Sequence, residues 1–273
     1  MFKRKSLLVS GLALLMVVAL FMSPAVRAAA SDFLGLFRVQ KFAPISISPR
    51  QMAVLQQVAE QGLYPGEIVM AQEPGQPQIA ESVEKAAELA GMAVRTLTNL
   101  DQASEIWVAS GGNGQLVINL DNARAILNAA EVDPKLLPDS LDGANINVTL
   151  YPSVEQSWAD GTVLFQTASP EVAYPEDVDV TLLGQALLEM LGMSRNEARQ
   201  LAANIDWTST LVLPIPQEFA TFSEVSVDGV SGLALTSVEG FGSSLMWQKD
   251  GIIYLLTNEG NVDDLLELAT SLN

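Results

Sequence analysis

A run of apolar strand patterns without intervening helices, between residues 207 and 256, constrains the fold most. Five strand candidates follow one another there: TLVLPI, EVSVD, GLALTS, SLMWQ and IIYLL. Asp250-Gly251 separates the last two, and an Asp-Gly pair favours a tight hairpin because both central residues of that turn need positive φ. A doubly wound fold would need regular alternation of strands and helices, which this region lacks. The pattern therefore predicts an antiparallel sheet built from hairpins.

Helix signals occur at six places, so the expected class is α+β with helices packed on the sheet. Their start signals are Ser/Thr/Asp/Asn caps, capping boxes and one proline at a first helical position. The expected helices are one after Ser48-Pro49, one after Ser82 that Gly91 ends, one over residues 121–131 with Asp121 or Asn122 as cap, one over residues 182–191, one after the capping box Ser194–Glu197, and one after Asn261. The stretch Asp133–Asp139 either marks a boundary between two lobes near residues 133–140 or is a surface loop in one unit.

Tryptophans recur next to turns in this sequence. Trp107 and Trp247 each precede a glycine-containing turn, an apolar strand and a helix, and Trp158 precedes the Asp160-Gly161 turn. Large aromatic side chains mostly pack in cores, so we interpret these tryptophans as packing residues of strand–turn–strand units, with a ligand or sugar platform as the alternative. The turn SGGNGQ after Trp107 is expected to join a hairpin, because it lacks the Lys-Ser/Thr of a phosphate loop.

Residues 227–272 carry a resemblance to a known family. The segment runs from VDGVSGLAL through the Trp247 hairpin to VDDLLELATSL, and it resembles the C-terminal part of an uncharacterised bacterial extracytoplasmic domain. The segments FLGLFRVQKF and ELAGMAVRTL resemble the same family. In relatives this domain often follows the membrane helix of anti-sigma-factor-like proteins, so the resemblance implies a regulatory role and no catalytic residues. Only five residues precede the apolar run here, so a cytoplasmic sigma-binding domain is not expected.

The first 30 residues have the pattern of an export signal or of an N-terminal membrane anchor. Lys3, Arg4 and Lys5 are basic, Ser6–Met22 is uncharged and mostly apolar, and Pro24 follows. Small residues then suit signal peptidase, which predicts processing at Ala28 and Ala30. Under both interpretations residues 31–273 lie outside the cytoplasm, in the cell envelope or released from the cell. The chain has no cysteine, so lipid attachment and disulfides are excluded.

Composition excludes several mechanisms and partners. The chain has neither His nor Cys, which removes the Ser-His-Asp triad, the thiolate nucleophile and the ordinary zinc site. The first 30 residues hold four of the 14 basic residues and none of the 32 acidic ones, so residues 31–273 carry 10 against 32, a net of −22. Such a surface repels phosphate backbones, so nucleic acid is not expected as a partner. No cofactor is expected either.

Three acidic clusters are the remaining candidates for a metal site. They are Glu176/Asp177/Asp179, Asp133/Asp139/Asp142 and Asn261/Asp263/Asp264. Their oxygen atoms suit calcium, yet none has the spacing of an EF-hand loop. Aspartate and asparagine also cap helices, so capping is the preferred interpretation and no metal is expected.

The segment FLGLFRVQKF, residues 33–42, is a candidate interaction surface. It holds the large apolar residues Phe33, Leu34, Leu36, Phe37, Val39 and Phe42. Phe33, Leu36 and Phe37 have helical spacing, which predicts a short helix that is followed by an edge strand near Pro44. Burial of such side chains is worth about 1.5–3 kcal/mol each, so they either join the core or form a docking patch for a partner or the membrane.

Two functions lead on this basis. The first is a non-enzymatic, exported envelope protein that binds a protein partner as a sensing or regulatory domain. The second is a carrier for an apolar small molecule held between the sheet and its helices. An enzyme that uses carboxylates is the third. A closed core with an exposed apolar patch would favour the first, a large dry cavity the second, and two facing carboxylates in a cleft the third.

Overall fold

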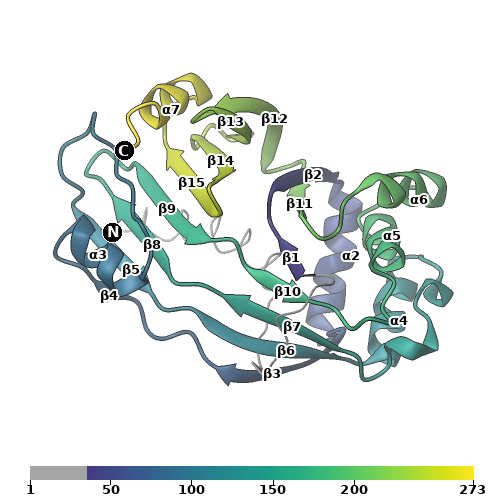
Figure 1. Cartoon of the computed structure of the whole chain (residues 1–273). Helices are drawn as coiled ribbons and strands as arrows, with labels where there is room; N and C mark the ends of the chain where they lie inside the picture. The colour runs from purple at the N-terminus through teal and green to yellow at the C-terminus, as the bar shows by residue number, and fades with distance from the viewer. Residues whose placement is uncertain (1–35) are drawn as a thin grey trace.

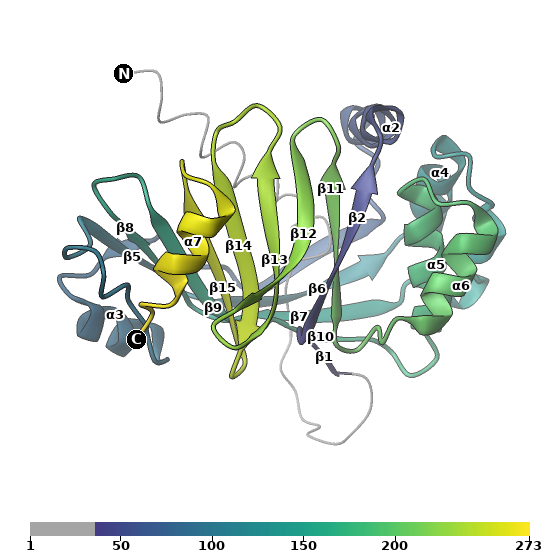
Figure 2. The ribbon, with the colours of Figure 1, turned by 90° about the horizontal axis from the view of Figure 1, so that it is seen from above.

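A computed structural model describes residues 36–273, which form six α-helices, two 3-10 turns and fifteen β-strands (Figure 1). The α+β class predicted from the sequence is confirmed. Helices α4, α5 and α6 gather at one end of the sheets, and α3 and α7 lie at the other (Figure 2). Within residues 36–273, none of the helices combines the length and the apolar character that a bilayer-spanning segment needs.

Three long extended segments form the centre of the fold. Each segment bends once, so that its two strands lie in different sheets. The segments are β5 (Glu105–Ala109) followed by β6 (Gly112–Ile118), β7 (Asn145–Leu150) followed by β8 (Ser153–Ser157), and β9 (Val163–Ala168) followed by β10 (Glu171–Ala173). One half of each lies in a five-stranded sheet of order β1-β10-β7-β6-β3, with β1 at Leu36–Arg38 and β3 at Gly66–Gln72. The other half lies in an eight-stranded sheet of order β12-β13-β14-β15-β9-β8-β5-β4, with β4 at Gln78–Ile79.

The glycine-rich segment after Trp107 does not form the expected hairpin. β5 pairs with β4 and β8, whereas β6 pairs with β3 and β7, so the segment carries the chain from one sheet into the other. At the bend, a Cβ on Gly111 would lie 2.1 Å from the carbonyl oxygen of Leu150. Only glycine allows the two backbones to approach this closely.

The C-terminal part of the eight-stranded sheet is the expected series of hairpins. Its strands are β12 (Ala220–Val227), β13 (Val230–Ser237), β14 (Ser243–Lys249) and β15 (Ile252–Asn258). Asp228-Gly229 and Asp250-Gly251 are both in the positive-φ region, so the two tight turns have the conformation that Asp-Gly favours. At Asp160-Gly161 only the glycine has positive φ, and the loop between β8 and β9 is longer.

Strands β2 (Lys41–Ile47) and β11 (Thr210–Pro216) form a separate parallel pair that packs beside the eight-stranded sheet. β2 contains Pro44 and pairs with β11 alone, which confirms the edge strand expected there. The prediction of a helical turn before β2 is wrong over Leu36–Arg38, because these residues form strand β1 and pair with β10. Sheet pairing satisfies their backbone groups at a position where Gly35 already weakens a helix.

The helix expected over residues 182–191 begins two residues earlier, at Val180, and four of the six helices begin at the predicted cap. Their bounds are α2 (Pro49–Glu60), α3 (Val83–Ala90), α4 (Leu120–Ala129), α5 (Val180–Met190), α6 (Arg195–Asn204) and α7 (Val262–Ala269). Capping boxes start α6 at Ser194 and α7 at Asn261. The cap of α4 is Asn119, whose side chain accepts from the backbone of Asn122 at 2.9 Å, so the prediction of Asp121 or Asn122 is wrong by two or three residues. The first turn of α4 includes the buried Leu120.

Residues 133–141 form two short 3-10 turns, η1 (Pro134–Leu136) and η2 (Asp139–Leu141). Leu137 and Leu141 are buried in an apolar cluster with side chains of α4 and with Ala186 of α5. The candidate linker therefore contributes to a hydrophobic core at the helical end.

Candidate functional site

Trp247 belongs to the core. It is fully buried in a cluster formed by β9, β12–β15 and α7, and its ring stacks on Tyr254 with 5.1 Å between the centroids. Trp158 is buried in the same cluster, and its Nε1 donates to the carbonyl oxygen of Asp101 at 2.8 Å. Trp107 is half-buried on the opposite face of the sheet. The packing interpretation is thus confirmed for Trp247 and Trp158.

A buried polar network beside this cluster was not predicted from the sequence. Arg95 forms an ion pair with Asp228 and donates to the carbonyl oxygen of Leu272 at 2.6 Å. The carbonyl oxygen of Arg95 accepts from Gln156 at 2.7 Å and from Gln166 at 2.8 Å, and both glutamine side chains are fully buried. The network holds the end of the chain and the β12–β13 turn against the sheet, which is a structural role.

The acidic clusters serve as caps and ion-pair partners. Asp179 accepts backbone hydrogen bonds at the start of α5, and Asn261 with Asp264 caps α7. A backbone hydrogen bond from Lys135, aided by the guanidinium of Arg195, lowers the pKa of the Asp133 carboxyl. Across residues 36–273, no three acidic side chains come together in a geometry that could hold a metal ion.

Glu105 and Glu155 lie on one face of the eight-stranded sheet, beside Trp107. Partial burial, and then the negative charge of Glu105, raise the pKa of Glu155. Glu155 is nevertheless solvent-accessible, and neither carboxylate lines the hollows described below. The two carboxylates thus lie on an exposed part of the sheet face.

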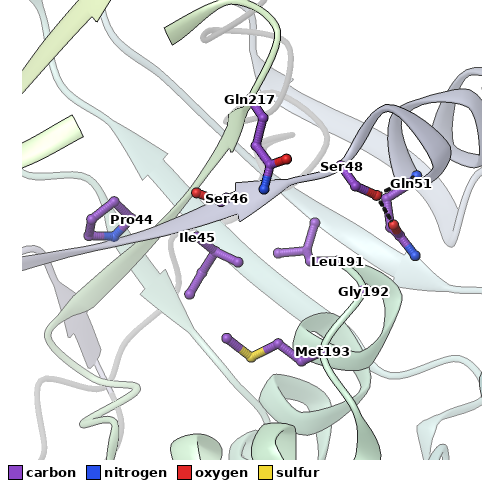
Figure 3. A pocket seen from close by; sticks show the side chains of 9 residues that line it. All are labelled: Pro44, Ile45, Ser46, Ser48, Gln51, Leu191, Gly192, Met193 and Gln217. Carbon is purple, nitrogen blue, oxygen red and sulfur yellow. Dashed lines mark hydrogen bonds between the residues drawn. The ribbon is translucent and has the colours of Figure 1, made fainter. Parts of the chain in front are cut away.

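Two surface hollows are open to solvent. The first, of about 340 Å³, lies between β2, the start of α2 and the α5–α6 turn (Figure 3). Ile45 and Leu191 form its apolar floor, and the amides of Gln51 and Gln217 lie at its edges. The second, of about 400 Å³, is at the β12–β13 turn and is lined mainly by polar residues and backbone. Both differ from the enclosed, dry cavity of an apolar carrier.

Large apolar side chains are exposed at one end of strands β12–β14. We call this surface the β12 rim: Phe219 (61% exposed), Phe222 (37%), Val238 (55%) and Phe241 (69%). Phe219 and Val238 are adjacent, because the Val238 N–H donates to the Phe219 carbonyl oxygen at 3.0 Å. Ser237 donates to the carbonyl oxygen of Gly242 at 3.0 Å, which closes the turn that carries Phe241 at the same end of the sheet. The rim thus holds three exposed aromatic side chains and a valine, and the register places Phe222 on the opposite face of the sheet from Phe219 and Val238.

The rim is acidic as well as apolar. Glu218, Glu224 and Glu239 lie on it or next to it, and within the described part of the chain none of the three has an ion-pair partner. No Lys or Arg occurs between Arg199 and Lys249. Lys249 itself is bound to Asp228, through the carboxylate and the carbonyl oxygen, both at 2.8 Å. The surface therefore presents aromatic rings and uncompensated negative charge together.

The surface that the sequence pointed to is a different one. Phe37 is buried at 7% exposure, and Phe42 is half-buried against a core cluster of β11, β13 and β14. Leu36 begins β1, whereas Phe33, Leu34, Ala28 and Ala30 lie outside the described residues. The signal for the β12 rim was present in PQEFATFSE and VEGFGSS, where phenylalanines stand among polar turn residues.

Comparison with known proteins adds no identification: no protein family matches the chain, and no curated protein or solved structure is significantly similar to it. The function is therefore argued from the β12 rim.

Proposed function

We propose that the chain is a non-enzymatic, exported envelope protein that binds a protein partner through the β12 rim, as a sensing or regulatory domain. The observation that supports this is the exposure of Phe219, Phe222, Val238 and Phe241 at one end of a sheet whose core is otherwise closed. Soluble proteins seldom keep aromatic side chains gathered in water unless a partner covers them. Aromatic residues are also the side chains that most often dominate the affinity of protein interfaces.

The proposed location of this partner is the cell envelope or the exterior. The basic start, the apolar run and the small residues at Ala28 and Ala30 support export, either with cleavage or with an uncleaved anchor. The resemblance to the extracytoplasmic domain of anti-sigma-factor-like proteins supports a regulatory role. Cell fractionation and N-terminal sequencing of the mature protein test this part, and a cytoplasmic protein that begins at Met1 would contradict it.

A second candidate function is the binding of a small, partly apolar molecule. It is favoured by the 340 Å³ hollow over Ile45 and Leu191, since that volume is within the range of ligand sites, about 300–1,000 Å³. Replacing Gln217 at the edge of the hollow by Trp would fill it. A ligand that raises the melting temperature of the wild type but not of this variant would support the second function.

Site-specific photo-crosslinking in cells tests the partner-binding function. A photoreactive residue at Phe219 or Phe241 is expected to give the same adduct with one protein. The matched control position is Ile79, which is equally exposed at 62% but lies on β4 at the opposite edge of the sheet. The captured protein is then purified and its affinity measured. Adducts of equal yield from all three positions, or no adduct from the rim, would overturn the proposal.

A further inference from the structure

Strand β12 is a long, regular sheet edge that carries one charged side chain, Glu224. Proteins protect exposed edges with short strands, bulges or prolines, because unpaired backbone groups recruit other chains. The other described edges have these devices: β1 and β4 are three and two residues long, β3 is interrupted by a bulge between Met70 and Gln72, and β2 and β11 contain Pro44, Pro214 and Pro216. β12 has eight residues in continuous register with β13 and contains neither proline nor glycine.

The turn at Asp228-Gly229 determines which backbone groups of β12 point outward. In a two-residue hairpin the flanking residues, Val227 and Val230, form a hydrogen-bonded pair, and bonding alternates from there. The bond from Val238 to Phe219 fits this alternation. The N–H and C=O groups of Phe222, Glu224 and Ser226 therefore face away from β13, and within residues 36–273 they have no backbone partner.

Both faces of this edge are accessible. Four consecutive residues, Thr221 to Glu224, are exposed, although their side chains alternate between the two faces of the sheet. The β2–β11 pair packs against Ala220 at the start of the strand and leaves Thr221 to Glu224 accessible to solvent. An added strand would find free backbone groups along this part of the edge.

Charge identifies the class of strand that fits. Phe222 and Glu224 lie on one face of β12, and an aromatic ring and a carboxylate both attract Lys or Arg. Thr221, Ser223 and Val225 lie on the other face, which suits β-branched apolar residues. A second copy of this chain would bring one acidic edge against another, which disfavours self-pairing.

We propose that an extended polypeptide segment with alternating cationic and apolar residues adds to β12 as a further antiparallel strand. This inference rests on the proposed function, since it names the chemistry of the partner at the β12 rim. Main-chain hydrogen bonds to Phe222, Glu224 and Ser226 supply affinity, and the face with Phe222 and Glu224 selects the cationic side chains.

The probe is a capped eight-residue peptide of alternating Lys and Val, compared with one of alternating Glu and Val. We expect NMR of the full chain to show slowed amide exchange at Phe222, Glu224 and Ser226 with the Lys-Val peptide alone. Glu224→Pro removes an outward N–H without touching the ladder to β13, so it should weaken binding by about tenfold or more while the melting temperature holds. Glu224→Lys keeps the strand and should also weaken binding, by about threefold or more.

The control is Ser223→Pro, which removes an N–H inside the ladder and should lower the melting temperature. The inference is overturned if the Glu-Val peptide binds equally well, if a folded Glu224→Lys variant binds undiminished, or if the edge is occupied by self-association. It is also overturned if Ser223→Pro is tolerated and Glu224→Pro is not. If photo-crosslinking finds a partner on the rim but the Lys-Val peptide does not protect β12, strand addition fails and the partner-binding function stands.

Discussion

The rings of Trp247 and Tyr254 are stacked 5.1 Å apart and only 12° from parallel, on neighbouring strands β14 and β15. Arg95 lies over the Tyr254 ring, with its Cζ 5.6 Å from the centroid, and pairs with Asp228 at the tip of the β12–β13 hairpin. The strand proposed to receive the partner is therefore connected through its turn to the most deeply buried part of the core.

Replacing Trp247 by Ala is expected to lower the free energy of unfolding by about 3–5 kcal/mol, because it leaves a cavity at a fully buried site. Trp247→Phe should lower it by less than half as much. The Nε1 of Trp247 has no hydrogen-bond partner among the described residues, so phenylalanine keeps stacking on Tyr254 and removes an unpaired donor. Urea unfolding checks both variants, and equal losses would contradict this account of the stack.

Acid should weaken the link between Arg95 and Asp228. Burial alone would raise the pKa of the Asp228 carboxyl, but hydrogen bonds from Arg95 and Lys249 outweigh it and hold the pKa below the ordinary value of 3.8. A lowered pKa contributes stability that is present above the unfolded value and is lost as pH falls through the folded value. We therefore expect the contribution of Asp228 to be complete at neutral pH and to decline below about pH 4.

Asp228→Asn isolates this contribution, since asparagine also tolerates the positive φ of 52° at this position. The expected loss at pH 7 is about 2–3 kcal/mol, below the range for fully buried pairs because Arg95 is partly exposed. The difference between wild type and variant should narrow as the pH falls below about 4. Unfolding curves at several pH values measure it, and a difference independent of pH would contradict the assignment.

Gly184 in the middle of α5 should not tolerate alanine, although this change usually stabilises a helix by about 1 kcal/mol. A Cβ at Gly184 would lie 2.0 Å from the ring of Trp207, whose Nε1 donates to the Ala202 carbonyl oxygen at 2.8 Å. Gly184→Ala must displace that ring and should lower the melting temperature. In the double variant Gly184→Ala/Trp207→Leu the alanine should be tolerated, and an equal penalty in both backgrounds would contradict the steric explanation.

Two phenylalanines on strands provide a matched test of core and surface. Phe37→Ala should lower the free energy of unfolding by about 3 kcal/mol, because Phe37 is 7% exposed. Phe222→Ala, on the exposed edge, should change it by less than about 1 kcal/mol and should weaken partner binding instead. Thermal unfolding and a binding assay separate the two, and the reverse pattern would place the interaction surface in residues 33–42.

Local signals in the sequence predicted much of the fold. The capping box at Ser194, the cap at Asn261 and the Asp-Gly turn at residue 250 depend on residues near in sequence and are found as expected. Strand β8 has no apolar strand pattern, because its sequence, SVEQS, is mostly polar. Gln156 in β8 is nevertheless fully buried, since its amide bonds the carbonyl oxygen of Arg95, a partner 61 residues away. Such long-range pairing leaves no local pattern.

The candidate site was the harder part to predict. The hydrophobicity of residues 33–42 suggested a surface, but hydrophobicity alone does not tell a buried strand from a docking patch, and Phe37 is buried. The β12 rim is assembled from two turns and a strand edge that meet only in the folded sheet. The prediction of a hairpin at SGGNGQ is wrong for a related reason. The chain bends there from one sheet into the other, and the close approach of Gly111 to Leu150 depends on the arrangement of both sheets.

The most direct test of the account is the affinity of the cross-linked partner for a Phe219→Ser/Phe241→Ser variant, with Ile79→Ser as the control. All three side chains are more than half exposed, at 61%, 69% and 62%, so each variant should keep its melting temperature. The account predicts that the double variant binds the partner at least about tenfold more weakly, whereas Ile79→Ser binds as the wild type does. Undiminished affinity of a folded double variant would contradict the proposal that the β12 rim is the partner-binding surface.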